Sequence, residues 1–252
     1  MPNFSSIIAP QTAKIAVSHS HALGTSDYDL DDLYSPDTDQ WRSKVLHIGS
    51  PKYSPNKTYA FDRSRYQNHG TITGAVWKQL PSGVWVLSLD GTDDVINLGK
   101  PAVLDGGLTE FSVVTWCYNF AAEGNAGIIG DIADTGTANQ CWHWRDAVGA
   151  GGTFLFYVSD GTNLKDANGP IVTPLNQWNM IGATFKAGAF INTYVNTSML
   201  ATATTLGALI TTRVHNLCIG QFSGAYNNAV FSEAWLYNRQ ITTAEFNQKY
   251  LA

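Results

Sequence analysis

Charged side chains are scarce in this chain. Asp, Glu, Lys and Arg together make up 14% of its 252 residues, against roughly 25% in an average globular protein. The formal net charge is -5, and the sequence contains no run of Lys or Arg. Because nucleic-acid binding needs a basic patch that displaces counterions from phosphates, the composition argues against nucleic acid as a partner. We expect instead a neutral, polar surface of amides and hydroxyls.

Long apolar stretches are also missing. No segment reaches the roughly 20 apolar residues of a membrane-spanning helix, so we expect no membrane span. The first ten residues, MPNFSSIIAP, lack a basic segment followed by an apolar run of roughly 7–15 residues. The sequence therefore predicts synthesis in a cytoplasm without a secretory signal peptide.

Cysteine is rare, and familiar catalytic motifs are absent. Cys117, Cys141 and Cys218 cannot all pair, and two of them lie within apolar strand patterns, so we predict buried thiols. The sequence contains no H-E-x-x-H, G-x-S-x-G, Walker or C-x-x-C motif. No standard hydrolase, nucleotide-binding or redox site is therefore predicted.

Short strands with turn residues between them are abundant from Tyr59 onward, which is typical of an all-β sandwich or jelly roll. The chain between residues 111 and 118 is apolar at both odd and even positions, so this strand is predicted to be central, with both faces covered. The predicted strands are Val84–Leu89, Val95–Leu98, Phe111–Phe120, Gly127–Gly130, Thr153–Ser159, Trp178–Phe185, Phe190–Asn196, Val214–Gly220 and Ala229–Tyr237.

The two ends of the chain differ from this pattern. Residues 1–55 are rich in Ser, His and Asp and are predicted to form an N-terminal arm or extension, with a short helix that begins near Ser35 and runs through Trp41 and Val45. Residues 56–252 are predicted to form one domain. At its end, Thr242 and Glu245 stand at capping-box spacing, which predicts a short C-terminal helix.

The final predicted strand alternates with a period of two. Val230, Ser232, Ala234 and Leu236 are predicted to lie on one face of the sheet, and Phe231, Glu233, Trp235 and Tyr237 on the other. In the helix that follows, Phe246 and Tyr250 are four residues apart and are expected to form its packing stripe.

Several segments, in this order, resemble laminin-G-like domains of the concanavalin A-like lectin/glucanase superfamily. The resemblance covers about residues 58–250. It rests on the segments Asp62–Gly70, Trp77, Leu87–Leu98, Phe111–Trp116, Gln177–Trp178, Tyr194–Asn196, Ile219–Gly220, Tyr237–Arg239 and Ala244–Phe246. It implies a two-sheet antiparallel jelly-roll sandwich, a fold that hosts glycan binders, adhesion modules, structural proteins and some glycosidases. The fold alone does not choose among these functions.

A glycosidase on such a sheet needs two carboxylates, roughly 5 Å apart in a retaining enzyme. The superfamily's glucanases carry an E-x-D-x-x-E pattern, and the four glutamates here do not form it: Glu110, Glu123, Glu233 and Glu245. We therefore predict that the protein is not an enzyme, with glycoside hydrolysis as a lesser alternative.

The resemblance also implies a metal site. Laminin-G-like domains often hold calcium on loops at a sheet edge, so calcium is the candidate cofactor; the alternative is that the acidic residues of segment 90–94 only form a turn. The candidate metal ligands are Asp62, Asp93, Asp94 and Glu233.

Candidate ligand-binding residues lie in the segment Cys141–Asp146 and in a later loop. Trp142, Trp144 and Asp146 are predicted to share one strand face, and an exposed Trp pair could stack on sugar rings. The alternative is that one or both Trp side chains belong to the core. The candidate ligand-binding residues are Trp142, Trp144, Arg145, Asp146, Tyr226 and Asn228.

The sequence thus predicts a non-catalytic recognition or adhesion module whose partner is a glycan or a neighbouring protein subunit. An alternative is a structural protein of a larger assembly, such as a phage or viral particle, in which residues 1–55 contact other subunits. The two hypotheses are compatible if a virion surface displays the domain, and we expect an oligomer or a component of a particle.

Overall fold

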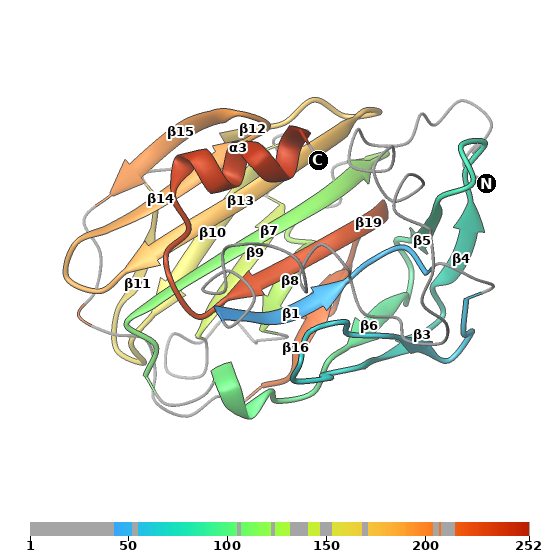
Figure 1. Cartoon of the computed structure of the whole chain (residues 1–252), viewed down its shortest axis with the longest axis horizontal. Coiled ribbons are helices and arrows are strands. Elements are labelled where there is room, and N and C mark those ends of the chain that lie inside the picture. The colour runs from blue at the N-terminus through green and yellow to red at the C-terminus, as the bar shows by residue number, and fades with distance from the viewer. Residues whose placement is uncertain are drawn as a thin grey trace, which may run out of the picture.

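The computed structural model shows two stacked antiparallel sheets and a short C-terminal helix (Figure 1). It describes residues 43–51, 55–104, 107–121, 124–131, 141–146, 153–167, 171–203, 207 and 215–251. The predicted fold class, an antiparallel jelly-roll sandwich, is confirmed.

The first sheet has eight strands in the order β15-β14-β13-β7-β19-β5-β4, with β1 also paired to β19. Its strands are β1 (Lys44–Ile48), β4 (Val76–Gln79), β5 (Trp85–Asp90), β7 (Glu110–Asn119), β13 (Trp178–Lys186), β14 (Phe190–Val195), β15 (Ser198–Ala203) and β19 (Asn228–Tyr237). The strands β7 and β13 are central and pair along their full lengths.

The second sheet has nine strands in the order β11-β10-β9-β8-β16-β6-β3-β2, with β12 paired to β10. Its strands are β2 (Tyr59–Ala60), β3 (Gly70–Thr73), β6 (Val95–Asn97), β8 (Gly127–Asp131), β9 (Trp142–Asp146), β10 (Thr153–Ser159), β11 (Leu164–Asp166), β12 (Ile171–Val172) and β16 (Leu217–Ile219). A separate hairpin is formed by β17 (Gln221–Phe222) and β18 (Ala225–Tyr226), and a 3-10 turn, η3, spans Ala102–Leu104. All nine predicted strands are present, with bounds that differ by a few residues.

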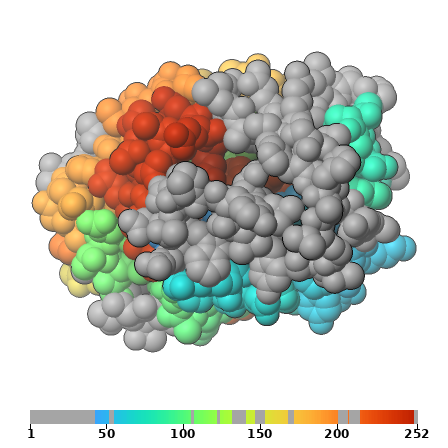
Figure 2. Space-filling view, viewed as in Figure 1, coloured from blue at the N-terminus to red at the C-terminus, as the bar shows by residue number. Residues whose placement is uncertain are grey.

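The main hydrophobic core lies between the two sheets, and a second cluster lies outside the first sheet. Phe111 and Val113 of β7 face the main core, whereas Val114 and Trp116 pack in the second cluster. The prediction that this strand is covered on both faces is therefore confirmed. The second cover is α3 (Thr243–Leu251), which lies across the outer face of the first sheet (Figures 1 and 2).

The helix α3 begins with the predicted capping box. The backbone N-H of Thr242 donates to Glu245 Oε2 at 2.7 Å, and the N-H of Glu245 donates to Thr242 Oγ1 at 3.2 Å. Phe246 is fully buried and stacks on Tyr194, while the side chain of Tyr250 lies outside the described part of the chain. Two otherwise unpaired N-H groups at the helix start are thereby satisfied.

The strand β19 departs from the predicted alternation because it contains a β-bulge. Its register with β7 shifts between Phe231 and Glu233. As a result Phe231 lies in the main core together with Leu236, although the period of two placed these residues on opposite faces. Trp235 remains on the opposite face, in the second cluster. An extra residue in a strand reverses the facing of everything beyond it.

The predicted boundary between residues 55 and 56 is wrong. All five residues of β1 are buried, and β1 pairs with β19 within the first sheet. Val45 was expected on a helix and instead lies on this strand, because β19 offers backbone partners along this part of its edge. Trp41 and most of the predicted arm, including its proposed subunit contacts, lie outside the described residues.

Two further expectations concern thiols and membranes. Cys117, Cys141 and Cys218 are buried free thiols, as predicted. Burial raises the pKa of both Cys117 and Cys218 to about 12, which leaves these thiols protonated and unreactive at neutral pH. Within the described part of the chain, no helix combines the length and apolar character needed to cross a membrane.

Candidate functional site

Trp142 and Trp144 lie in the main core. Both side chains are at most 1% exposed, and the Trp142 ring packs against Phe111 while the Trp144 ring packs against Phe156. The prediction of an exposed, sugar-stacking Trp pair is therefore wrong, and the alternative that these residues belong to the core is confirmed. The reason is that β9 lies inside the second sheet, between β8 and β10, with these side chains facing the other sheet.

Arg145 and Asp146 point to opposite sides of β9, so they cannot hold one ligand between them. Asp146 is buried and accepts a hydrogen bond from Gly124 N. Arg145 is on the outer face, where its guanidinium lies over the rings of Tyr157 and Phe222. The predicted division of β9 into two faces is confirmed, but the predicted cluster of ligand-binding side chains is not formed.

Tyr226 and Asn228 lie near the β17–β18 hairpin, which folds over the outer face of the second sheet. Both residues are half-buried. The hairpin contacts β8, and its Phe222 stacks on His143 of β9 at a ring-centroid distance of 4.2 Å. Tyr226 belongs to this hairpin, whereas Asn228 is the first residue of β19 in the first sheet and pairs with Asp90, so the two candidates lie on different elements.

The carboxylate of the candidate metal ligand Asp62 accepts four hydrogen bonds from neighbouring residues. Its Oδ1 accepts hydrogen bonds from His47 N and Ser64 N, and its Oδ2 accepts from Ser64 Oγ and Asn68 N, at 2.7–2.8 Å. Glu233 lies on the outer face of the first sheet, 3.6 Å from His47 Nε2. The four predicted metal ligands therefore do not form one site.

Asp93 and Asp94 do come together, with Asp90 as a third carboxylate. Ligand oxygens of the three residues all lie within 4.8 Å of one another. Asp94 is buried and accepts from Asp90 N at 2.8 Å, and Asp90 accepts from Thr92 N. Burial raises the pKa of Asp94, and the nearby charges of Asp90 and Asp93 act in the same direction. This turn at the end of β5 is the part of the predicted metal set that fits a hard cation.

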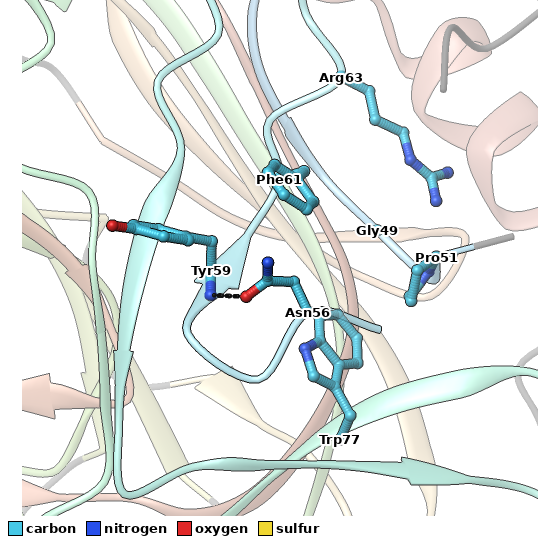
Figure 3. Close-up of a pocket in the computed structure, with 7 residues that line it drawn as sticks. All are labelled: Gly49, Pro51, Asn56, Tyr59, Phe61, Arg63 and Trp77. Atoms are coloured by element: carbon cyan, nitrogen blue, oxygen red, sulfur yellow. Dashed lines mark hydrogen bonds between the residues drawn. The ribbon is translucent and has the colours of Figure 1, made fainter. Parts of the chain in front are cut away.

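A shallow surface hollow lies where β1 ends, beside β2 and β4 (Figure 3). Its empty space, including the part open to solvent, is about 300 Å³. Three aromatic side chains, an arginine and an asparagine gather in it. The lining residues are Gly49, Pro51, Asn56, Tyr59, Phe61, Arg63 and Trp77.

The aromatic side chains of the hollow are unusually accessible. Tyr59 is 44% exposed and Phe61 is 40% exposed, and Trp77 is half-buried. The rings of Tyr59 and Phe61 lie 6.4 Å apart, and Phe61 is held from behind by an edge contact with His69. Because exposed large aromatic side chains on a protein surface often mark a contact surface, this hollow is the leading candidate site.

Local hydrogen bonds explain why these side chains converge. Asn56 Oδ1 accepts from Thr58 N at 2.7 Å and from Tyr59 N at 3.0 Å, which forms a turn directly before β2 (Figure 3). Arg63 donates from its guanidinium to the carbonyl oxygen of Ser50 and from its backbone N-H to His47 O. The end of β1 and the segment that follows β2 are thereby tied together.

Sequence reasoning missed this site. The available signal was the spacing of Tyr59, Phe61 and Arg63, whose alternation along an extended chain places them on one side. Trp77 reaches the same place from β4 of the other sheet, and no local pattern predicts that approach. The lining has no carboxylate, histidine or thiol, so it offers contacts and hydrogen-bond donors but no acid-base pair.

The stacked antiparallel sheets define a two-layer jelly-roll sandwich. A sequence model described as the concanavalin A-like lectin/glucanases superfamily matches residues 90–247. The chain belongs to this superfamily. Among the curated proteins, none matches the sequence.

Solved structures show the same fold at low sequence identity. The chain is similar to a structure of botulinum neurotoxin type C, described as entering cells through two ganglioside molecules, with a TM-score of 0.61 and 12% identity over 83% of this chain and 51% of that one. It is similar to the binding domain of Paraclostridial Mosquitocidal Protein 1, with a TM-score of 0.62 and 14% identity over 83% of this chain and 52% of that one. The chain thus spans about half the length of the neurotoxin chains it matches.

A third similar structure corresponds to nearly a whole chain. It is domain 4 of AbnA, a GH43 extracellular arabinanase from Geobacillus stearothermophilus, in complex with arabinotriose. The TM-score is 0.60, and the identity is 14% over 82% of this chain and 98% of that one. At these identities the comparisons establish the fold.

Proposed function

We propose that the protein is a non-catalytic glycan-binding module and that the hollow formed by Asn56, Tyr59, Phe61, Arg63 and Trp77 is its binding site. The observation that carries this proposal is the exposure of Tyr59 and Phe61 beside an arginine and an asparagine. Aromatic faces pack against the C-H faces of sugar rings, and polar groups at the rim fix the orientation of the ligand.

Binding is favoured over hydrolysis because the hollow has no acid-base pair. Glycoside hydrolysis uses two carboxyl groups that flank the scissile bond, and none of the lining residues is acidic. The described carboxylates that do approach one another, Asp90, Asp93 and Asp94, lie in a turn outside the lining. Two of them accept backbone N-H groups that hold this turn. Similar structures described with gangliosides or arabinotriose support a glycan as the ligand class.

Removing either exposed ring should weaken sugar binding. We expect Tyr59→Ala or Phe61→Ala to lower the affinity for an oligosaccharide that binds the wild type by about 10- to 100-fold, because each removes a large apolar face from the complex. A glycan array identifies the ligand, and calorimetry on the full chain measures the affinity. Leu200→Ala is the matched control, since Leu200 is 49% exposed on β15, at the far edge of the first sheet from β4. Equal losses in all three variants would contradict the assignment of the hollow.

We also propose that a calcium ion binds the carboxylates of Asp90, Asp93 and Asp94 and stabilises the turn that they form. A cation there would relieve the repulsion among three carboxylates that lie within 4.8 Å. We expect calcium at about 100 times its dissociation constant to stabilise the chain by about 2.7 kcal/mol. Thermal unfolding with calcium and with a chelator measures this. Asp93→Asn should remove the effect, and an unchanged melting temperature in the wild type would refute the proposal.

A further inference from the structure

We infer that the hollow selects a carboxylated sugar, such as a uronic or sialic acid, and that Arg63 binds its carboxylate. This inference rests on the proposed function and adds the charge of the ligand to it. Three independent features carry it: the state of Arg63, the hydrogen-bonding groups that remain free in the hollow, and the arrangement of the aromatic rings around them.

Arg63 keeps a charge that no carboxylate of the described residues neutralises by an ion pair. Within the described part of the chain, its side chain donates one hydrogen bond, to the neutral carbonyl oxygen of Ser50. Glu233 approaches from the first sheet, but its carboxylate lies beside His47, 3.6 Å from Nε2, and forms no ion pair with Arg63 among the described residues. A guanidinium has five N-H donors in a planar fork that matches a carboxylate, so Arg63 retains most of its capacity to bind one.

Gly49 lies directly beside this guanidinium. A Cβ atom at Gly49 would lie 3.1 Å from His47 Nε2, 3.5 Å from Arg63 Nη1 and 3.5 Å from Glu233 Cγ. Three charged or titratable side chains therefore converge on a position without a side chain. In the close-up, Arg63 reaches toward Gly49 and Pro51 at one end of the hollow (Figure 3).

The free polar groups at the hollow are mainly donors. Asn56 Oδ1 already accepts two backbone N-H groups, which leaves its amide Nδ2 to donate. The Tyr59 hydroxyl, which could also accept, points away from the other lining side chains (Figure 3). The Asn56 amide and the remaining N-H groups of Arg63 are all donors, so this lining favours a ligand rich in acceptor oxygens.

The rings and the arginine together specify a sugar acid rather than a simple anion. Phe61 stands between Tyr59 and Arg63 in the chain, and the three alternate residues reach the same hollow. A pyranose that packs on the Tyr59 and Phe61 rings can therefore extend a carboxylate toward the guanidinium. Acetate would gain only the ionic contact, and a neutral sugar would gain only the packing.

The comparison of glucuronate with glucose tests this selectivity, because the two differ only in the oxidation state of one carbon. We expect the full chain to bind glucuronate about 10- to 100-fold more tightly than glucose, as charge-assisted hydrogen bonds add to the packing. N-acetylneuraminate serves as a second acid, and acetate as a simple anion that should bind far more weakly. Titration calorimetry and ligand-observed NMR provide the affinities, and added salt should weaken binding of the acids.

Three arginine variants locate the carboxylate. Arg63→Gln should lower the affinity for glucuronate by about 10- to 100-fold and so bring it close to that for glucose, and Arg63→Lys should retain part of the preference. Arg65→Gln is the matched control, because Arg65 is an exposed neighbour whose guanidinium lies over Tyr66, outside the hollow. Melting temperatures of all variants confirm that each is folded.

The outcomes separate this inference from the proposed function. Equal affinity for glucose and glucuronate, unaffected by Arg63→Gln, would overturn the inference and leave a neutral glycan site. Acetate binding as tightly as glucuronate would show a simple anion site and also overturn it. Failure of every sugar on a broad panel to bind would reject the proposed function itself.

Discussion

Replacing Phe246 with alanine should lower the free energy of unfolding by about 3–5 kcal/mol, the range for a buried Phe cut back to alanine. Phe246 is completely buried, and its ring stacks on Tyr194 at a centroid distance of 4.6 Å. It also lies directly over Gly182 of β13, where a Cβ atom would come within 2.2 Å of its ring. Gly182 and Tyr194 pack closely around this ring, so its removal leaves a cavity between α3 and the first sheet.

Urea unfolding monitored by Trp fluorescence measures this loss. Phe61→Ala is the matched control, because it makes the same chemical change at a position that is 40% exposed. Its expected cost is below about 1 kcal/mol, as for most surface substitutions. Equal losses of stability in the two variants would contradict the burial of Phe246 in the second hydrophobic cluster, between α3 and the first sheet.

The sequence alone predicts those strands and the helix that depend on patterns among neighbouring residues. The period of two in segments such as Phe111–Phe120 follows directly from side-chain alternation, and the Thr242–Glu245 capping box needs only four consecutive residues. Strands that depend on a distant neighbour were missed. β1 gave no strand prediction because its formation depends on the edge of β19, almost two hundred residues away.

The predicted ligand-binding site around Trp142 and Trp144 was wrong for a different reason. Alternation assigned Trp142 and Trp144 to one face of β9 correctly, but it does not say which face is inside. Both faces of this strand are covered, the inner by the core and the outer by Phe222 of the β17–β18 hairpin. Aromatic content therefore could not distinguish them. The hollow was missed because its lining comes from β2, from β4 and from the end of β1.

We expect the protein to be sensitive to acid, because a buried histidine lies on the outer face of β9 that the β17–β18 hairpin covers. His143 is 2% exposed and lies between the rings of Phe222 and Tyr157, at centroid distances of 4.2 Å and 5.0 Å. Burial lowers its pKa to about 3, and the charge of Arg145 acts in the same direction. Neither of its ring nitrogens has a hydrogen-bond partner among the described residues, so nothing there stabilises a proton.

His47 adds a second buried imidazole. Burial holds its pKa well below the usual value, with further lowering by the charges of Lys44, Arg63 and Lys249. In the unfolded chain a histidine has a pKa of about 6.5. Below that pH the unfolded state binds protons that the folded state does not, so stability is complete above pH 6.5 and falls as the pH decreases toward the folded values.

His143 should therefore cost about 1.4 kcal/mol of stability per pH unit below 6.5, and His47 acts in the same direction. Between pH 7 and pH 5 we expect the wild type to lose about 2 kcal/mol through His143. Urea unfolding across this range gives the slope. His143→Phe keeps an aromatic ring between Phe222 and Tyr157 but cannot be protonated, so its loss over the same range should be smaller than that of the wild type by about 2 kcal/mol. An unchanged slope in His143→Phe would mean that His143 is protonated in the folded protein, and that the hairpin does not shield it.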